Sequence, residues 1–269
     1  MEGGALQPSM TGDTILETRG LTKEFRGFVA VDHVNLAVRR GAIHALIGPN
    51  GAGKTTTFNL LTKFLQPTRG AILYNGEDIT RDKPADVARR GIIRSFQISA
   101  VFPNLTVLEN VRIALQRSLG TSFHFWKSAK SLEKLNDRAM ELLARVGLTQ
   151  FARINAGELA YGRKRTLEIA TTLAMEPELM LLDEPTASMG HEDVDRVRDL
   201  IKEVAVGRTV LMVEHNMSVV SGICDMITVL ARGAVLAEGP YSVMSQHPAV
   251  IEAYMGSSEG TGAVGAHHG

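Results

Sequence analysis

The residues of this sequence best suited to chemistry form a glycine-rich segment that ends in Lys54 and Thr55. The segment fits G-x-x-x-x-G-K-[ST], a pattern typical of loops that hold nucleotide phosphates. Glycines allow successive backbone N–H groups to turn toward phosphate oxygens, and the N-terminus of a following helix adds a positive dipole. We expect Lys54 to contact the β- and γ-phosphates and the Thr55 hydroxyl to bind Mg²⁺. The predicted nucleotide-binding residues here are Gly48, Pro49, Asn50, Gly51, Ala52, Gly53, Lys54, Thr55 and Thr56.

A second candidate group consists of two adjacent carboxylates that follow an apolar run. Residues 179–182 contain no polar side chain, and Asp183 and Glu184 come directly after them. We expect Asp183 to hold Mg²⁺, directly or through water, and Glu184 to polarise the attacking water. Acidic residues that merely close a strand are the alternative. The glycine-rich loop in the same chain favours the catalytic interpretation.

The elements around these residues predict an α/β core. Residues 42–47 and 210–213 are mostly apolar runs, which suit strands buried on both faces of a parallel sheet. The first run leads into the glycine-rich segment and a predicted helix from Lys54 to about Phe64. Strands that alternate with helices indicate a parallel sheet. An amphipathic helix is predicted by the spacing of Val194, Val197, Leu200, Ile201 and Val204. A half-buried antiparallel strand is predicted by Val34, Leu36 and Val38, which alternate with polar or small residues.

The stretch from about residue 98 to 157 has a different character. Thr106 and Glu109 form a capping-box pattern before an expected helix over 107–115. A second expected helix runs over 132–146 and ends at Gly147. We interpret 98–157 as a helical subdomain inserted into a domain that spans 14–256. Residues 1–13 and 257–269 are rich in small and polar residues and are predicted to be disordered tails.

Composition excludes several classes of protein. Lys+Arg and Asp+Glu each number 29, so no net charge points to a nucleic acid as the partner. The single cysteine, Cys224, cannot form a disulfide within the chain, and its apolar neighbours suit a small buried side chain. No apolar run reaches the roughly 20 residues that a membrane-spanning helix needs. If membranes are involved, another polypeptide is expected to cross them.

Further motifs give the chain a resemblance to the ATP-binding-cassette (ABC) family over nearly its whole length. Gln97 matches the glutamine that in that family senses Mg²⁺, and His215 matches the switch histidine. Phe25 stands where the family places an aromatic ring that stacks on adenine. Residues 159–163, L-A-Y-G-R, match the signature usually written LSGGQ, with Ala160, Tyr161 and Gly162 as its candidate nucleotide contacts. A glycine followed by a helix offers a second anion site, here the expected helix over 164–174.

Two segments depart from the family pattern. In the signature, Ala160, Tyr161 and Arg163 replace Ser, Gly and Gln, and Gly190 stands where Asp or Asn is more usual. These departures put full-strength turnover in question but leave the phosphate loop intact. Within the family, L-A-Y-G and the C-terminal sequence resemble the branched-chain (hydrophobic) amino-acid importers.

The resemblance implies a P-loop cassette with an antiparallel β-subdomain and an inserted helical subdomain. It implies Mg²⁺-dependent ATP hydrolysis. The implied catalytic residues are Lys54, Glu184, His215 and Gln97, and the implied metal-binding residues are Thr55, Gln97 and Asp183. The implied partners are membrane-spanning permease subunits, a second cassette (identical or a paralogue) and, indirectly, a solute-binding protein, at the cytoplasmic face of the inner (plasma) membrane.

Four alternatives remain open at this stage. They are an importer for urea, amides or aromatic acids, a lipopolysaccharide exporter, a regulatory ATP-binding module with weak hydrolysis, and a cassette protein that acts in translation or DNA repair.

Overall fold

The computed structural model describes residues 14–95, 101–118 and 129–255. Gln97 and both predicted tails lie outside these ranges. No helix in the described ranges combines the length and the apolar character needed to cross a membrane.

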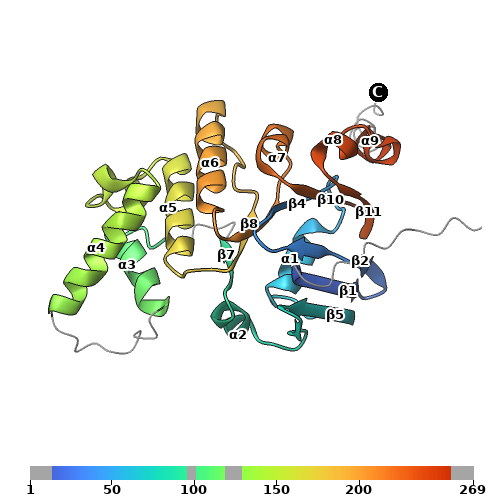
Figure 1. Cartoon of the computed structure of the whole chain (residues 1–269), viewed down its shortest axis with the longest axis horizontal. Coiled ribbons are helices and arrows are strands. Elements are labelled where there is room, and N and C mark those ends of the chain that lie inside the picture. Colours follow the sequence, from blue (N-terminus) through green and yellow to red (C-terminus); the bar gives the residue numbers. More distant parts are fainter. Residues whose placement is uncertain (1–13, 96–100, 119–128, 256–269) are drawn as a thin grey trace, which may run out of the picture.

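A mainly parallel sheet forms the centre of the molecule (Figure 1). Its strand order is β11-β10-β4-β9-β8-β7, with β11 antiparallel at one edge. In β4, β8 and β9 every residue is buried, which confirms the expectation drawn from their apolar runs. The strands are β4 (Ile43–Ile47), β7 (Ile92–Ser95), β8 (Leu179–Asp183), β9 (Thr209–Val213), β10 (Met226–Ala231) and β11 (Ala234–Gly239).

A second, antiparallel sheet lies beside the central one, as the resemblance implied. Its order is β2-β1-β5-β6, and β3 pairs with β1. Val34, Leu36 and Val38 are all buried, but they do not form one strand, because β2 ends at Val34 and β3 begins at Ala37. The prediction of a continuous strand is therefore wrong. The strands are β1 (Thr14–Phe25), β2 (Phe28–Val34), β3 (Ala37–Arg39), β5 (Arg69–Tyr74) and β6 (Glu77–Asp78).

Two apolar cores cover the two faces of the central sheet. Leu46, Leu181 and Leu211 pack with the antiparallel sheet and helix α1 (Lys54–Leu61). Their sequence neighbours, including Met180 and Met212, pack on the other face with helices α5 to α7. This alternation is the period-two pattern of a strand with both faces buried. The helices are α5 (Tyr161–Leu173), α6 (His191–Val204) and α7 (Met217–Ile223).

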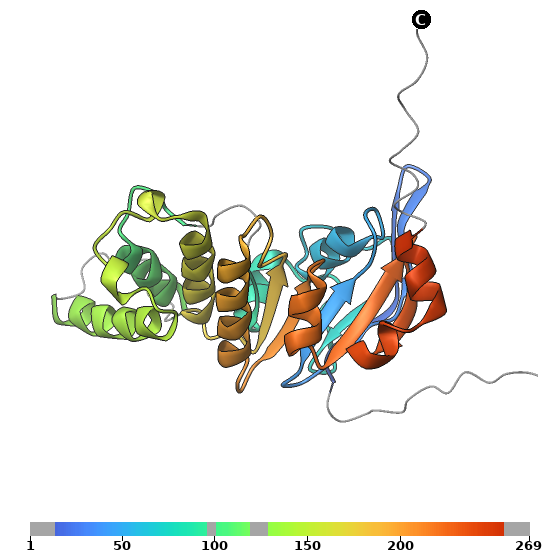
Figure 2. The same ribbon diagram turned by 90° about the horizontal axis from the view of Figure 1, so that it is seen from above.

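Helices α3 (Val107–Ser118) and α4 (Ala129–Arg145) pack against α5 at one end of the molecule (Figures 1 and 2). The predicted capping box is confirmed, since the Thr106 N–H donates to Glu109 Oε2 at 2.8 Å and the Glu109 N–H donates to Thr106 Oγ1 at 3.2 Å. Short turns η1 (Thr149–Phe151) and η2 (Ala156–Glu158) lead into α5. The boundaries of the helical subdomain stay a prediction.

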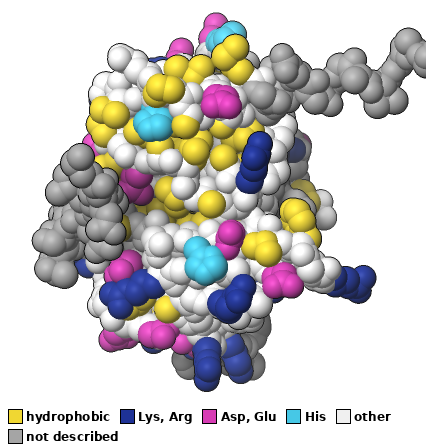
Figure 3. All heavy atoms as spheres, turned by 90° about the vertical axis from the view of Figure 1, so that its right-hand side faces the viewer, with side chains coloured by type: hydrophobic (Ala, Val, Ile, Leu, Met, Phe, Trp, Pro, Cys, Tyr) yellow, Lys and Arg dark blue, Asp and Glu magenta, His cyan; other side chains and the backbone are white. Residues whose placement is uncertain are grey.

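The C-terminal region forms two short helices against β11. They are α8 (Tyr241–Met244) and α9 (Pro248–Met255), while α2 (Pro84–Arg89) precedes β7. Apolar side chains gather in the upper half of Figure 3, at the height of α8 and α9 in Figure 1. These two helices include the exposed residues Val243, Ile251 and Met255.

Candidate functional site

Three of the four predicted catalytic residues, Lys54, Glu184 and His215, follow the C-terminal ends of three neighbouring parallel strands. Strand β4 leads into the phosphate loop, β8 ends in Asp183, and β9 is followed by Glu214 and His215. β9 pairs with both β4 and β8, with Val213 opposite both Leu46 and Asp183. Ligands of parallel α/β sheets bind at this edge. The sheet register therefore brings the ends of these strands together.

The phosphate loop turns tightly around its own lysine. Lys54 begins α1 and is buried, and its Nζ donates to the carbonyl oxygens of Gly48 at 2.6 Å and Pro49 at 2.9 Å. Burial lowers the pKa of Lys54, and the nearby Glu184 carboxylate acts in the opposite direction. The ammonium is thus held inside the loop by backbone oxygens. Thr55, on the first turn of α1, is exposed.

The loop also depends on glycine at its first position. Gly48 has φ +148°, and a Cβ there would lie 2.1 Å from the carbonyl oxygen of Leu230 on β10. Gly53 is similarly constrained, with 2.6 Å between a Cβ and the Ala30 carbonyl oxygen. Gly51 is different, because no atom lies within 4 Å of a Cβ there.

The two adjacent acidic residues, Asp183 and Glu184, lie in different surroundings. Asp183 is fully buried, and its Oδ2 pairs with the Arg94 guanidinium. Its Oδ1 is buried too and has no hydrogen-bond partner within the described ranges. Glu184 follows in the left-handed region at φ +46°, and its N–H donates to the Val213 carbonyl oxygen at 2.9 Å. The turn after β8 is therefore fixed to the end of β9.

Glu214, which the motif analysis missed, connects this turn to His215. Its side chain is fully buried, and Oε1 accepts hydrogen bonds from the Thr186 hydroxyl and from the Thr186 N–H at 3.3 Å. Oε2 accepts from the N–H groups of His215 at 2.8 Å and Asn216 at 3.3 Å. A buried carboxylate is costly unless hydrogen-bonded, and here several donors supply that need. The His215 imidazole itself is 61% exposed.

The signature segment lies away from the phosphate loop of its own chain. In Figures 1 and 2, α5 lies on the opposite side of β8 from α1. The helix begins at Tyr161 rather than at the expected residue 164, because the backbone of Ala160 is already extended and serves as the N-cap. Ala160 makes no side-chain capping bond. The structure does not bring the two predicted anion-binding segments together within one chain.

Two contacts explain the unusual residues of the signature. The Arg163 guanidinium lies over the Phe151 ring, 4.3 Å from its centroid, and so packs on η1. The Tyr161 hydroxyl accepts a hydrogen bond from Arg165 Nη2 at 3.0 Å, and Arg165 forms a buried ion pair with Glu168. A Cβ at Gly162 would lie 2.8 Å from Oδ2 of the partly exposed Asp193 side chain on α6, so a larger residue there would require that side chain to move.

The remaining predicted contacts are less enclosed. Phe25, the expected adenine-stacking residue, is 41% exposed at the end of β1, and the Lys23 ammonium lies 5.0 Å from its ring centroid. Gln97 lies outside the described residues, two positions beyond the end of β7. The roles of Phe25 and Gln97 stay predictions.

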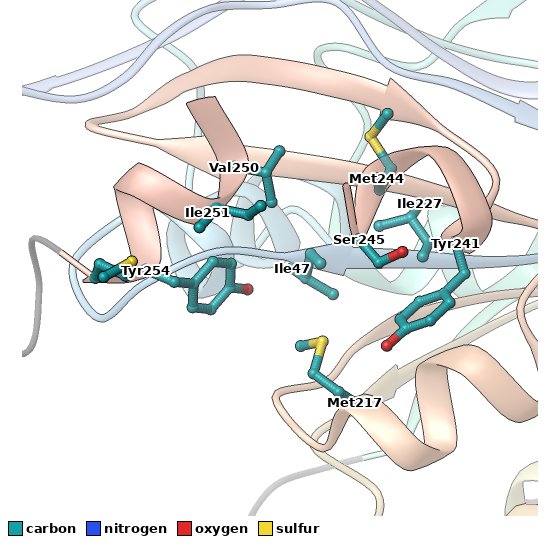
Figure 4. A pocket seen from close by; sticks show the side chains of 10 residues that line it. Ile47, Met217, Ile227, Tyr241, Met244, Ser245, Val250, Ile251 and Tyr254 are labelled. Atoms are coloured by element: carbon teal, nitrogen blue, oxygen red, sulfur yellow. The ribbon is translucent and has the colours of Figure 1, made fainter. Parts of the chain in front are cut away.

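A small apolar pocket joins the C-terminal helices to the base of the phosphate loop (Figure 4). Its volume is about 300 Å³, and its lining includes Ile47, Met217, Tyr241, Val250 and Tyr254. Burial raises the pKa of the Tyr254 hydroxyl, while its contact with the backbone of Gly48 acts in the opposite direction. The C-terminal region therefore contacts the phosphate loop. No local sequence motif predicts this contact.

The donors at the strand ends fit a magnesium ion better than a transition metal. Mg²⁺ takes oxygen ligands and is usually held by one or two carboxylates together with substrate phosphates. Asp183 Oδ1, buried and without a partner in the described part of the chain, and the exposed Thr55 hydroxyl are such donors. Within the same residues there is no cluster of three His, Cys, Asp or Glu side chains able to hold a metal.

Comparisons with known proteins agree with this geometry. The family model described as ABC transporter matches residues 31–187, and the model for branched-chain amino acid ATP-binding cassette transporters matches residues 234–260. The chain is 41% identical to the high-affinity branched-chain amino acid transport ATP-binding protein BraF of Pseudomonas aeruginosa, over 91% of this chain and 98% of BraF. It is 39% identical to the corresponding protein LivG of Escherichia coli, with the same coverage.

Solved structures lead to the same family. An ABC transporter cassette in its ADP conformation superposes with a TM-score of 0.78 at 31% identity, over 90% of this chain and 99% of that one. A dimeric cassette bound to ADP and Pi superposes with a TM-score of 0.72 at 26% identity, over 84% and 98%. With its phosphate loop, its acidic strand end and its central sheet, this chain belongs to the ABC transporter family as an ATP-binding cassette.

Proposed function

We propose that this cassette hydrolyses ATP to power the import of branched-chain or other hydrophobic amino acids through separate permease subunits. The observation that carries the proposal is the convergence of Lys54, Glu184 and His215 from three adjacent strand ends. The likeness to BraF and LivG, both branched-chain amino acid transport proteins, supports the choice of solute.

In the proposed reaction, water attacks the γ-phosphorus of ATP and ADP leaves. Glu184 orients this water and accepts its proton, and the Lys54 ammonium offsets the charge that develops on the phosphate oxygens. His215 steadies the γ-phosphate. Mg²⁺, held by Thr55 and Asp183, would neutralise charge between the β- and γ-phosphates. The Glu184 N–H, which donates to Val213, and the Glu214 carboxylate, which accepts from Thr186 and His215, hold the ends of β8 and β9 together. These bonds fix the backbone positions of Glu184 and His215.

A second cassette is part of the proposal. The N-terminus of α5 has no side-chain cap, so its N–H groups and dipole are suited to a phosphate. Because α5 lies across the sheet from the chain's own phosphate loop, we infer that it serves ATP bound to a partner cassette. The dimeric relative bound to ADP and Pi is consistent with such an arrangement.

The proposed docking site for the permease is a groove of about 300 Å³ beside β7. Phe64, Ala85, Ala88, Ile93 and Arg94 are among its lining residues, and β7 leads toward Gln97. Phe64 is 55% exposed, an apolar surface that a permease helix could cover. Docking here would keep the cassette at the cytoplasmic face of the membrane, with a solute-binding protein as an indirect partner.

Reconstitution with the permease subunits and the solute-binding protein in liposomes tests the proposal. We expect ATP-dependent leucine uptake, and a phenylalanine-to-aspartate change at Phe64 should abolish uptake while ATP binding persists. Val206→Asp, at another exposed apolar residue after α6, is the matched control and should transport normally. Within residues 100–104, a charge at the buried Val101 would disturb the core, so Phe102→Asp is the better probe of that segment. If the Phe64 variant binds permease as well as the wild type does, the docking site is not at this groove.

A further inference from the structure

Arg94 occupies a position between the metal-binding strand end and the surface. It lies on β7, and its side chain is only 9% exposed. Its guanidinium donates to Asn59 Oδ1 on α1 at 2.6 Å and pairs with Asp183 Oδ2 at the end of β8. One side chain therefore joins the phosphate-loop helix, the acidic strand end and the strand that leads toward Gln97.

The ion pair fixes the orientation of the Asp183 carboxylate. A guanidinium is planar and presents its donors in a rigid fork, so it restrains a carboxylate more strongly than an ammonium would. Because Oδ2 is engaged by Arg94, the other oxygen, Oδ1, stays available for a metal ion or its bound water. The pairing also offsets part of the cost of burying the Asp183 carboxylate.

The groove described above reaches Arg94. Arg94 is among the residues that line this groove, together with Phe64. Its guanidinium carbon lies 6.0 Å from the Phe64 ring centroid and 5.9 Å from that of the buried Phe58. A partner that covers Phe64 would also exclude the little water that still reaches the Arg94 side chain, and the ion pair with Asp183 would then lie wholly in a low-dielectric environment.

We propose that Arg94 is a positioning residue that transmits occupancy of the groove to the Asp183 carboxylate. It holds Asp183 so that Oδ1 meets the metal–nucleotide complex, and a permease element in the groove fixes this arrangement. The inference rests on the proposed function only for the identity of the groove's occupant. An ion pair that merely stabilises the fold is the competing explanation.

The first test uses the isolated full chain and fluorescent ATP, with Mg²⁺ in one series and EDTA in the other. Arg94→Met should weaken ATP binding at least about tenfold with Mg²⁺, the usual effect of losing a residue that orients a metal ligand. With EDTA, binding should match the wild type, because Lys54 and the loop are unchanged. Arg90→Met removes an arginine whose ion pairs are on the surface, and it should leave affinity in both series within about threefold.

Equal affinity of wild type and Arg94→Met in both series would overturn the inference, as would an equal loss in both. If Arg94→Met does not fold, Arg94→Lys keeps the charge but cannot contact both Asn59 and Asp183. It should show the same selective loss with Mg²⁺ to a smaller degree, and its absence would also overturn the inference.

The second test measures how far permease subunits stimulate ATP hydrolysis by each variant in the assembled complex. Arg94→Met should bind permease but lose most of the stimulation, and Arg90→Met should keep it. Normal stimulation of Arg94→Met would refute the transmitting role. Failure of the wild-type chain itself to bind permease would instead refute the proposed function, so the two failures are distinguishable.

Discussion

The phosphate loop allows a sharp comparison between two of its glycines. Gly48→Ala places a Cβ 2.1 Å from the Leu230 carbonyl oxygen, which belongs to the backbone of β10 and cannot rotate away. The substitution also forces alanine to adopt φ +148°. Backbone strain of this kind costs about 1–3 kcal/mol. With displacement of the strand added, we expect Gly48→Ala to lower the free energy of unfolding by at least about 3 kcal/mol.

Gly51→Ala is the matched control in the same loop. Its φ is +77°, but no atom lies within 4 Å of the added Cβ. Only the left-handed conformation is penalised, at about 1–2 kcal/mol.

Urea unfolding followed by circular dichroism measures both changes, and ATP titration measures their effect on the loop. Gly48→Ala should lose ATP affinity because the carbonyls that hold Lys54 move with it, whereas Gly51→Ala should retain most of it. Equal destabilisation by the two variants would refute the steric argument.

Three further predictions concern single residues. Lys54→Ala should reduce ATP affinity while the circular dichroism spectrum is preserved, and wild-type affinity would contradict the lysine's assignment. Burial lowers the pKa of His44 from 6.5 to about 4, so the unfolded chain binds more protons between these values and stability falls as the pH drops through this window. Unfolding at pH 7.5 and 5 should show a loss of about 2 kcal/mol that His44→Gln removes, and an equal loss in that variant would exclude His44 as its source. Ala160→Ser should change the ATPase rate of the complex less than about tenfold, because several backbone N–H groups outweigh one hydroxyl; a larger gain would mean that the hydroxyl is needed.

The sequence predicted the parts of the fold that depend on local patterns. The apolar runs that became β4, β8 and β9 and the apolar stripe of α6 agree with the structure, because burial of these side chains follows directly from their spacing. The capping box at Thr106 agrees because both of its members lie within one helical turn.

The features that sequence patterns missed depend on contacts between distant segments. Arg94 and Asp183 are 89 positions apart and meet only because β7 pairs with β8. Glu214 bonds to Thr186, 28 positions away, across the ends of β8 and β9. The signature helix began earlier than predicted because Ala160, a weak capping residue by type, adopts the extended N-cap conformation. The position of Arg94, three residues before Gln97, was a usable but weak signal.

The surroundings of Gly162 affect which substitution tests the signature best. Aspartate at this position would place a Cβ and a second carboxylate beside the Asp193 carboxylate, so the Asp193 side chain would have to move. Loss of activity in such a variant would therefore not report on phosphate binding alone. Changes at Ala160, which is exposed at the helix start, avoid this complication.

The central claim is that ATP bound at the phosphate loop is hydrolysed with Glu184 as the base. The most direct measurement compares wild-type and Glu184→Gln chains in the reconstituted complex, with ATP binding and phosphate release followed in the same samples. Glutamine keeps the size of the side chain but cannot accept the proton of the attacking water, so ATP should bind normally and turnover should fall at least about 10²-fold. Near-normal phosphate release by Glu184→Gln, with ATP binding intact, would contradict the account.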